Sequence, residues 1–565
     1  MKYLLLLFVT FLTLNAAEVP EMVNSEAQES ALRDQELKKQ IGRMLIIGFV
    51  GQDINKNSQI VKDIQKYDLG GVILFDKFYD ERTKTKNISS PNQLQRLTKK
   101  LQMFTDKELF IAIDQEGGKV ARLKPLYGFE EIPSAFEVSQ LDLQNAKSIY
   151  EKQSYMLQKA GINLNFAPVV DLALNQKNEV IVALERSFGS DSNRVASFAE
   201  VMIQEQKRKG VVSVLKHFPG HGSSLKDSHE GFVNVSKTWT TKELEPYQKL
   251  IDKREVAMIM TAHVFNKHLD LDYPATLSYR VNTEILRGKM GYNGLIISDD
   301  MQMKAISEHY STKEAITLAI NAGVDILLFG NQLADFNVDE LVETIFTQVK
   351  SGAIPNERIV ESNQRIQNLH TQNAIVQKPI TFTQKRKDMT KEYIKTHYAL
   401  NVRDITIKPE MIVLHWTAVM DFNECFVRLN GEELYSDRSD IANASVLNVS
   451  AHFLVARDGT IYQLMPDNWM ARHVIGLNYS SIGIENVGGE DNAKDDLTDA
   501  QLKANIRLVN YLKQKYPSIQ QIIGHHEYRE YENSPLWLEK DAGYRTIKAD
   551  PGERFTNAVR AGVNG

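Results

Sequence analysis

The chain has 565 residues, of which 42% are hydrophobic and 25% charged, an ordinary composition for a globular protein. This length exceeds what one ordinary hydrophobic core organises, so we expect two domains. The net charge of -5 gives no electrostatic reason to expect nucleic acid or an acidic membrane as a partner.

The N-terminus has the pattern of a secretory signal peptide. A basic start at Lys2 precedes an apolar run, Leu4–Leu14, and small residues that end at Ala17. The run is well short of the ~20 residues of a membrane-spanning helix, so we expect no stable membrane insertion. We predict a signal peptide over residues 1–17 and an exported protein, periplasmic or secreted. Cys425 is the only cysteine, which excludes an internal disulfide, and we expect it to be buried.

Apolar runs alternate with amphipathic stretches over residues 35–375. The predicted strands are Met44–Phe49, Gly71–Phe75, Leu109–Ile113, Leu164–Val170, Val211–Leu215, Val256–Thr261, Gly294–Ser298 and Val324–Phe329. Continuous apolar strands separated by helices are covered on both faces, as in a parallel (β/α)8 barrel of the TIM type. A doubly wound open sheet is the alternative, but eight such units favour the barrel.

Polar residues with catalytic chemistry follow several of these strands directly. They are Asp114 after the third strand, Asp171 after the fourth, Lys216 and His217 after the fifth, His263 after the sixth and Asp299 after the seventh. Active sites of parallel barrels lie at the carboxyl ends of the strands, so this placement indicates function. We expect Asp171 and His263 to be structural residues of the barrel mouth.

The pattern changes towards the C-terminus. Residues 376–404 are polar and rich in lysine and threonine, and we expect a linker there. Residues 405–565 contain short strands, a hairpin signal at Asp458–Gly459 and a predicted helix over Thr498–Tyr516. We therefore predict a second domain of mixed α/β structure.

The first domain contains the groups that glycoside hydrolysis needs. The reaction requires a proton donor for the leaving oxygen and a carboxylate that traps or stabilises the oxocarbenium-like carbon. Asp299 ends an apolar strand and is a candidate nucleophile. His229 is a candidate acid and base, because Asp227 can orient its ring and raise its basicity.

Five segments of the first domain carry a resemblance to a known family. They are Lys216–His221, Asp227–His229, Ala112–Gly118, Glu185–Gly189 and Ser298–Asp300. Together they resemble the β-N-acetylglucosaminidase branch of glycoside hydrolase family 3. The resemblance implies a retaining mechanism without a cofactor, with Asp299 as nucleophile and the Asp227–His229 pair as acid and base.

The same resemblance implies a sugar site. The terminal N-acetylglucosamine would be bound by Asp114, Arg122, Arg186, Lys216 and His217. Some relatives with such a His–Asp pair transfer the sugar to phosphate. A phosphate-dependent N-acetylglucosamine phosphorylase is therefore the alternative for the barrel.

Three residues of the second domain have the chemistry of metal ligands. His415 and His525 each follow a short apolar strand, and Asp550 precedes a Pro-Gly turn. Two imidazoles and one carboxylate form a zinc site that leaves a position open for water. The spacing between these residues is not diagnostic, because lone histidines are more often structural.

Local sequences around these residues resemble the zinc N-acetylmuramoyl-L-alanine amidases, which share their fold with peptidoglycan recognition proteins. The segments are Val413–Thr417, Ser450–Phe453, Ser481–Glu485, Gly524–His525 and Lys548–Gly552. The resemblance implies that zinc is bound by His415, His525 and Asp550. Glu485 would activate the attacking water, and Lys548 would stabilise the oxyanion. His526 competes with His525, but neighbouring residues of an extended chain point to opposite sides, so we expect one ligand.

Both resemblances imply peptidoglycan fragments as substrates. One site would remove N-acetylglucosamine, and the other would cut the amide between the muramic acid lactyl group and L-alanine. We predict a bifunctional hydrolase of cell-wall recycling that acts on N-acetylglucosaminyl-N-acetylmuramyl peptides. The alternative for the second domain is a peptidoglycan-binding module without activity.

Overall fold

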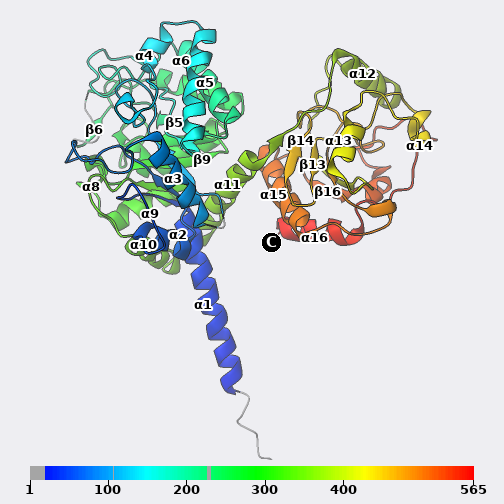
Figure 1. Ribbon diagram of the computed structural model, residues 1–565, viewed down its shortest axis with the longest axis horizontal. Helices are drawn as coiled ribbons and strands as arrows, with labels where there is room; N and C mark the ends of the chain where they lie inside the picture. Colours follow the sequence, from blue (N-terminus) through cyan, green and yellow to red (C-terminus); the bar gives the residue numbers. More distant parts are fainter. Residues whose placement is uncertain (1–18, 106, 226–230, 565) are drawn as a thin grey trace, which may run out of the picture. The chain divides into compact units, whose positions relative to one another are not determined.

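The structure is a computed structural model that describes residues 19–105, 107–225 and 231–564. It divides into two compact units, Met1–Asn363 and Gln364–Gly565, and each is described by itself (Figure 1). The predicted signal peptide and the Asp227–His229 pair lie outside the described residues. Within the described ranges, no helix is both long enough and apolar enough to cross a membrane.

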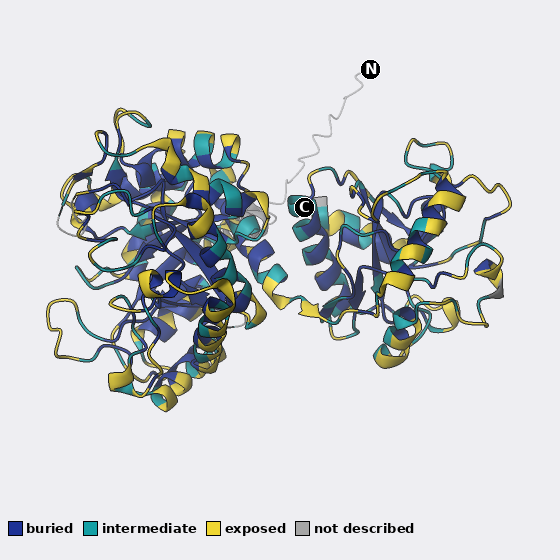
Figure 2. Cartoon of the chain, turned by 90° about the horizontal axis from the view of Figure 1, so that it is seen from above, coloured by how far each residue is buried: buried dark blue, intermediate teal, exposed yellow. Residues whose placement is uncertain are grey.

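The first unit is a closed barrel of eight parallel strands. These are β1 (Leu45–Gly48), β2 (Gly71–Ile73), β3 (Phe110–Ile113), β4 (Leu164–Asn165), β5 (Val212–Phe218), β7 (Met258–Thr261), β9 (Leu295–Asp300) and β10 (Ile326–Phe329). Their order is β1-β10-β9-β7-β5-β4-β3-β2, which confirms the predicted barrel and excludes the open sheet. The strands are buried because the barrel interior covers one face and the helices cover the other (Figure 2).

One helix, α1 (Val19–Arg43), precedes the first strand, and the other helices of this unit follow the strands. They are α2 (Gln59–Tyr67), α3 (Pro91–Met103), α4 (Ala135–Ser139), α5 (Leu143–Lys159), α6 (Ser192–Arg208), α7 (Glu245–Asp252), α8 (Lys304–Ser307), α9 (Thr312–Ala322), α10 (Val338–Lys350) and α11 (Asn356–Ala374). Short 3-10 helices are η1 (Pro125–Tyr127), η2 (Thr241–Leu244) and η3 (Ala275–Leu277), and η4 (Arg280–Lys289) is a π-helix. The N-cap carboxylates of Asp142 and Asp191 accept backbone N–H groups at the starts of α5 and α6.

A small parallel sheet extends the carboxyl ends of the barrel strands. It pairs β6 (Val233–Asn234), from the segment after β5, with β8 (Val264–Phe265), which begins just beyond the end of β7. The loops after β5 and β7 are thereby joined on the face where the candidate residues of the barrel lie.

The second unit is built on a six-stranded mixed sheet. Its strands are β11 (Val376–Gln377), β12 (Met411–Trp416), β13 (Phe453–Val455), β14 (Ile461–Gln463), β15 (Ser481–Asn486) and β16 (Gln521–Gly524), in the order β11-β14-β13-β15-β12-β16. β13 and β14 are antiparallel around the predicted turn, where Gly459 has a φ of 85° that favours glycine. The other pairs are parallel.

Helices pack on both faces of this sheet. They are α12 (Gln384–Tyr398), α13 (Phe422–Asn430), α14 (Ser439–Ala442), α15 (Asp499–Lys515) and α16 (Glu553–Asn564), with 3-10 helices η5 (Glu490–Asn492) and η6 (His525–Tyr531). Ile412 and Leu414 of β12 pack with α15 and α16, whereas Met411 and Val413 pack with α12. Because side chains alternate along a strand, the next residue, His415, lies on the α12 face.

The segment 376–404, for which the sequence predicts a linker, is folded onto the second unit. It contains β11 and α12, and Tyr393, Ile394 and Tyr398 of α12 are buried in the core. The side chain of Arg386 is also buried, and it donates hydrogen bonds to four backbone carbonyls. Polar and aromatic residues thus form the buried face of α12, so the helix shows no simple apolar period.

Candidate active sites

Charged side chains meet at the carboxyl ends of β3 and β5. Lys216 Nζ donates to Asp114 Oδ1 at 2.9 Å and lies 2.7 Å from Glu116 Oε1. Arg122 donates to Asp114 Oδ2 at 3.2 Å. Burial opposes ionisation, but the two cations hold the pKa of Asp114 well below its usual range. Asp114 is therefore charged at neutral pH and can accept hydrogen bonds from sugar hydroxyls.

Arg186 and His217 continue this network. Arg186 binds Glu116 with two hydrogen bonds, at 2.7 and 2.8 Å, and its Nη2 lies 3.3 Å from His217 Nε2. An arginine can only donate, so His217 Nε2 accepts and Nδ1 carries the proton, which it donates to Asp171 Oδ2 at 2.7 Å. Asp171, expected to be a structural residue, orients a predicted substrate-binding side chain.

The segment after His217 is held by buried polar groups that the sequence did not single out. Asn178 Nδ2 donates to the carbonyl of His221 at 2.9 Å. Glu243 Oε2 accepts from the backbone N–H of Gly222 at 2.9 Å. Asn178 and Glu243 follow no predicted strand and belong to no motif, so only the structure reveals them.

Asp299 lies in the last part of β9 and is half-buried. Its Oδ1 accepts from the backbone N–H of Asp300 at 2.8 Å, and His263 Nε2 lies 2.9 Å from the carbonyl oxygen of Asp300. In the barrel order β9 is separated from β5 by β7 alone. The candidate nucleophile therefore lies on the same mouth as the network around Lys216, and its strand end is fixed by His263.

Three candidate metal ligands converge in the second unit. His415 Nδ1 lies 3.0 Å from His525 Nδ1 and 3.2 Å from Asp550 Oδ2, and His525 Nδ1 lies 3.0 Å from the same oxygen. All three side chains are buried. Tetrahedral zinc with bonds of about 2.0–2.1 Å separates its ligand atoms by about 3.3 Å. The cluster therefore fits one ion after a small outward shift of each side chain.

His473, which the sequence analysis missed, sets the tautomer of His415. Its Nδ1 lies 3.0 Å from His415 Nε2, and its Nε2 lies 3.2 Å from Ser481 Oγ. Ser481 donates its proton to the carbonyl of Leu477 at 2.8 Å, so it accepts from His473 Nε2. His473 Nδ1 then accepts from His415 Nε2, which leaves the lone pair of His415 on Nδ1, facing the other ligands.

The candidate base lies beside the metal cluster because of strand register. His415 of β12 is paired directly with Glu485 of β15. Glu485 Oε2 is buried and has no hydrogen-bond partner among the described residues. Burial and the Asp550 carboxylate raise the pKa of Glu485 well above its usual range, and the charges of Arg438 and Lys548 act against this rise. A carboxylate with high proton affinity suits a group that takes a proton from water.

The other histidines of this region are engaged elsewhere. The backbone N and the ring Nδ1 of His526 lie 2.9 and 3.1 Å from the carbonyl oxygen of Asp550, so His525 alone of the two offers its ring to the cluster. His452 Nδ1 accepts from the backbone N–H of Gly483 at 2.9 Å, which makes it a structural residue of the sheet.

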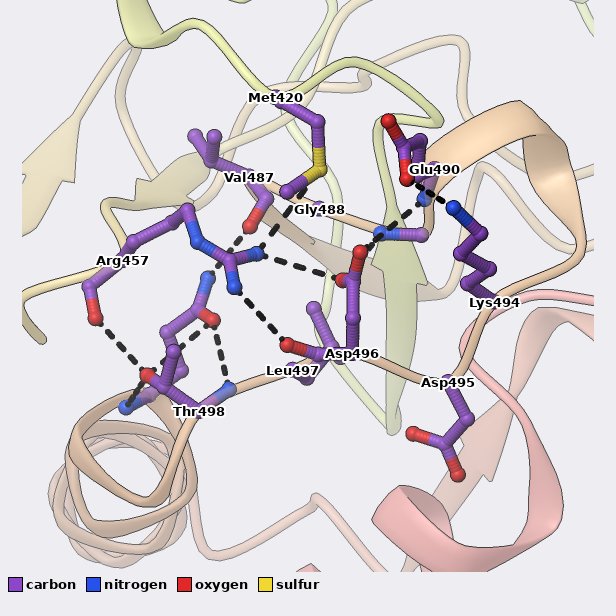
Figure 3. A network of polar contacts seen from close by, with 12 residues as sticks. Met420, Arg457, Val487, Gly488, Glu490, Lys494, Asp495, Asp496, Leu497 and Thr498 are labelled. Carbon is purple, nitrogen blue, oxygen red and sulfur yellow. Dashed lines mark hydrogen bonds and ion pairs between the residues drawn. The ribbon is translucent and has the colours of Figure 1, made fainter.

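The loop between β15 and α15 is held by a network of polar contacts. The Asp496 carboxylate accepts from the backbone N–H of Gly489 at 2.8 Å and from Arg457 at 3.2 Å (Figure 3). Trp416, the residue after the first histidine ligand, donates to Asn492 of this loop at 2.7 Å. These contacts fix the loop at the end of β12.

Comparisons with known proteins match both units. The model of the glycosyl hydrolase family 3 N terminal domain matches residues 36–369, and that of N-acetylmuramoyl-L-alanine amidase matches residues 406–553. Beta-hexosaminidase A of Pseudoalteromonas piscicida is 32% identical over 336 residues, 54% of either chain. Beta-hexosaminidase of Tolumonas auensis is 36% identical over 272 residues, 47% of this chain and 77% of that protein.

Solved structures of similar proteins point the same way. The match with a glycoside hydrolase family 3 beta-N-acetylglucosaminidase from Paenibacillus spans 86% of this chain and 84% of that protein. The two are 25% identical, and the TM-score is 0.54. The match with Beta-N-acetylhexosaminidase from Beutenbergia cavernae spans 59% of this chain and 98% of that protein. The two are 25% identical, and the TM-score is 0.53. The chain therefore belongs to glycosyl hydrolase family 3, and its second unit is an enzyme domain of the N-acetylmuramoyl-L-alanine amidase family.

Proposed function

We propose that the barrel removes terminal N-acetylglucosamine from β-glycosides. The observation that carries this proposal is the network of Asp114, Glu116, Arg186, Lys216 and His217 on the barrel mouth that also holds Asp299. It offers charged acceptors and donors for the hydroxyl and amide groups of one sugar ring. The hexosaminidase names of the relatives support the same choice of sugar.

For this reaction we propose a retaining mechanism. Asp299 attacks the anomeric carbon and forms a glycosyl ester while His229, oriented by Asp227, protonates the leaving oxygen. His229 then takes a proton from water, which attacks the same carbon and releases the Asp299 carboxylate. The first product is the β-anomer of N-acetylglucosamine. Proton NMR during the first minutes of the reaction checks this, and initial release of the α-anomer contradicts it.

We propose that the second unit cleaves the amide between the lactyl group of muramic acid and L-alanine, with zinc held by His415, His525 and Asp550. Bound zinc polarises the amide carbonyl and acidifies water. Glu485 accepts the proton of the attacking water and passes it to the leaving nitrogen. The Lys548 ammonium group donates to the carbonyl oxygen as negative charge develops there.

Together the two sites suit N-acetylglucosaminyl-N-acetylmuramyl peptides, which contain both bonds. The matches of one chain to a glycosyl hydrolase family and to the N-acetylmuramoyl-L-alanine amidase family support this proposal. We also propose export by the signal peptide at residues 1–17, which would place the protein in the compartment where cell-wall fragments arise.

Mass spectrometry of one defined N-acetylglucosaminyl-N-acetylmuramyl peptide tests the proposal. We expect loss of one N-acetylglucosamine with or without a zinc chelator, and release of the peptide only without it. A parallel reaction with inorganic phosphate must not yield N-acetylglucosamine 1-phosphate, which would make the barrel a phosphorylase. Intact substrate in every tube would overturn both activities.

A further inference from the structure

A cavity of about 760 Å³ opens beside the barrel mouth. Tyr79 and Asp80 line it from the loop after β2, Met301 and Gln302 from the loop after β9, and Leu333 from the loop after β10. Loops that follow the strands of a parallel barrel gather at the carboxyl end of the barrel. The cavity is therefore on the same face as the proposed sugar site.

Close contacts connect this cavity to the strand end that carries the candidate nucleophile. A Cβ atom on Gly330 would lie only 2.5 Å from Asp300 Oδ2, so the carboxylate that follows Asp299 lies directly against the end of β10. The next residue, Asn331, accepts a hydrogen bond from Gln302 Nε2 at 2.9 Å, and Gln302 lines the cavity. The end of the strand that carries Asp299 is thus packed against residues next to the cavity.

The lining of the cavity has mixed chemistry. Tyr79 and Leu333 provide accessible apolar surface, and Ile306, Ile316 and Phe329 are buried beneath it. Lys304 and Glu308 provide exposed charges of opposite sign at the edge. An N-acetylglucosamine ring carries no carboxylate for such a lysine, whereas a peptide joined through its N-terminus offers alkyl groups, carboxylates for Lys304 and amide N–H donors for Glu308. The volume lies within the range of about 300–1,000 Å³ for small-ligand sites.

We propose that this cavity binds the peptide of the leaving group while the barrel removes the sugar. The inference rests on the proposed function, because the amidase domain indicates a muramyl leaving group that carries a peptide. The barrel then acts on the fragment before the amide is cut, and the peptide contributes to substrate binding. Sugar removal comes first in the sequence of the two reactions.

The test uses the full chain with Glu485→Gln, so that the peptide stays attached. Two substrates are compared, N-acetylglucosaminyl-N-acetylmuramic acid and the same disaccharide carrying L-alanyl-D-glutamate. We expect the peptide to lower KM by about ten-fold. Lys304→Glu, which repels the peptide carboxylates, and Ala334→Trp, which fills the cavity from an exposed position, should each abolish this gain.

Lys313→Glu is the matched control, because Lys313 is equally exposed in α9 but does not line the cavity. It should keep the full gain from the peptide, and all three variants should cleave the bare disaccharide and 4-nitrophenyl N-acetylglucosaminide at the parent rate. Equal KM values for the two disaccharides in the parent chain would overturn the inference and leave the proposed function intact. No cleavage of the bare disaccharide would overturn both.

Discussion

At the residue scale, the barrel site is a set of buried charges that neutralise one another. Lys216 contacts both Asp114 and Glu116, and Arg186 contacts both Glu116 and His217. Each group has a partner, so none bears the full cost of a buried charge. Glu243 differs, because it is buried and no ion pair joins it to a cation among the described residues. Burial without a cation favours the protonated form of a carboxyl group.

Glu243→Gln will therefore change how the stability of the first unit depends on pH. Burial, reinforced by the Asp171 carboxylate, raises the pKa of Glu243 from 4.5 to about 8. The folded state holds this proton more tightly than the unfolded chain. The free energy of unfolding of the wild type therefore falls by about 1.4 kcal/mol per pH unit between the pKa of Glu243 in the unfolded chain and its pKa in the folded protein. Above the folded pKa this contribution is constant.

Thermal unfolding of the two proteins across pH 4.5 to about 8 measures this effect. The glutamine variant should gain in melting temperature over the wild type as the pH rises, and the gap should become constant above the upper limit. Exposed Glu245→Gln is the control and should show no such trend. A gap that is independent of pH would contradict the assignment.

His473→Ala will weaken zinc binding without removing a ligand. The substitution deletes the acceptor that holds His415 Nε2 and so releases the tautomer and ring orientation that the metal needs. Loss of such a partner typically lowers metal affinity by about 10- to 100-fold. Competition with a chromophoric chelator measures the affinity, and substitution of the exposed His309 of the first unit by alanine should leave it unchanged. Equal affinities in the wild type and in His473→Ala would show that His415 is positioned by other contacts.

At the element scale, α12 is fastened to the second unit by a buried ion pair. His397 Nδ1 lies 3.0 and 3.1 Å from the two oxygens of Glu539, and its Nε2 lies 3.0 Å from the carbonyl oxygen of Ala444. Both ring nitrogens face acceptors, so the site favours the doubly protonated ring. Burial acts to lower the pKa of His397, but Glu539 outweighs it and the net pKa is raised above 6.5.

This contact will make the second unit less stable in alkaline solution. The stabilisation from a histidine with a raised pKa is complete below its usual value of 6.5 and is lost as the pH rises through the folded value. Urea unfolding of the wild type and His397→Gln should show a large difference in stability near pH 6 and a smaller one near pH 9. A difference that does not change with pH would mean that the ring is held in its neutral form.

The contrast between β12 and α12 shows what sequence patterns reveal. Alternation along β12 and β15, with apolar residues on one face, is enough to place His415 and Glu485 together once the strands pair. In α12 the buried positions include Arg386, Thr390 and His397, which satisfy their polar groups internally and hide the helical period. His473 is likewise defined only by tertiary contacts, which no local pattern encodes.

At the scale of the whole molecule, the two sites depend on different physics. The barrel site is held by ion pairs between protein side chains. The second site brings two histidines and a carboxylate around a position that suits a metal ion. An ion that binds only the folded domain adds its binding free energy to the stability of that domain alone. The two units should therefore respond differently when metal is removed.

Chelation of the zinc-loaded protein will lower the melting temperature of the second unit and leave that of the first unchanged. At a free metal concentration of about 1,000 times Kd, the bound ion contributes about 4 kcal/mol, which a strong chelator removes. Calorimetry with and without chelator measures both transitions. His415→Ala should melt its second unit at the same temperature in either solution, because its metal site is already lost. A change in the melting temperature of the barrel on chelation would contradict a zinc site confined to His415, His525 and Asp550. So would a wild type in which the chelator changes neither melting temperature.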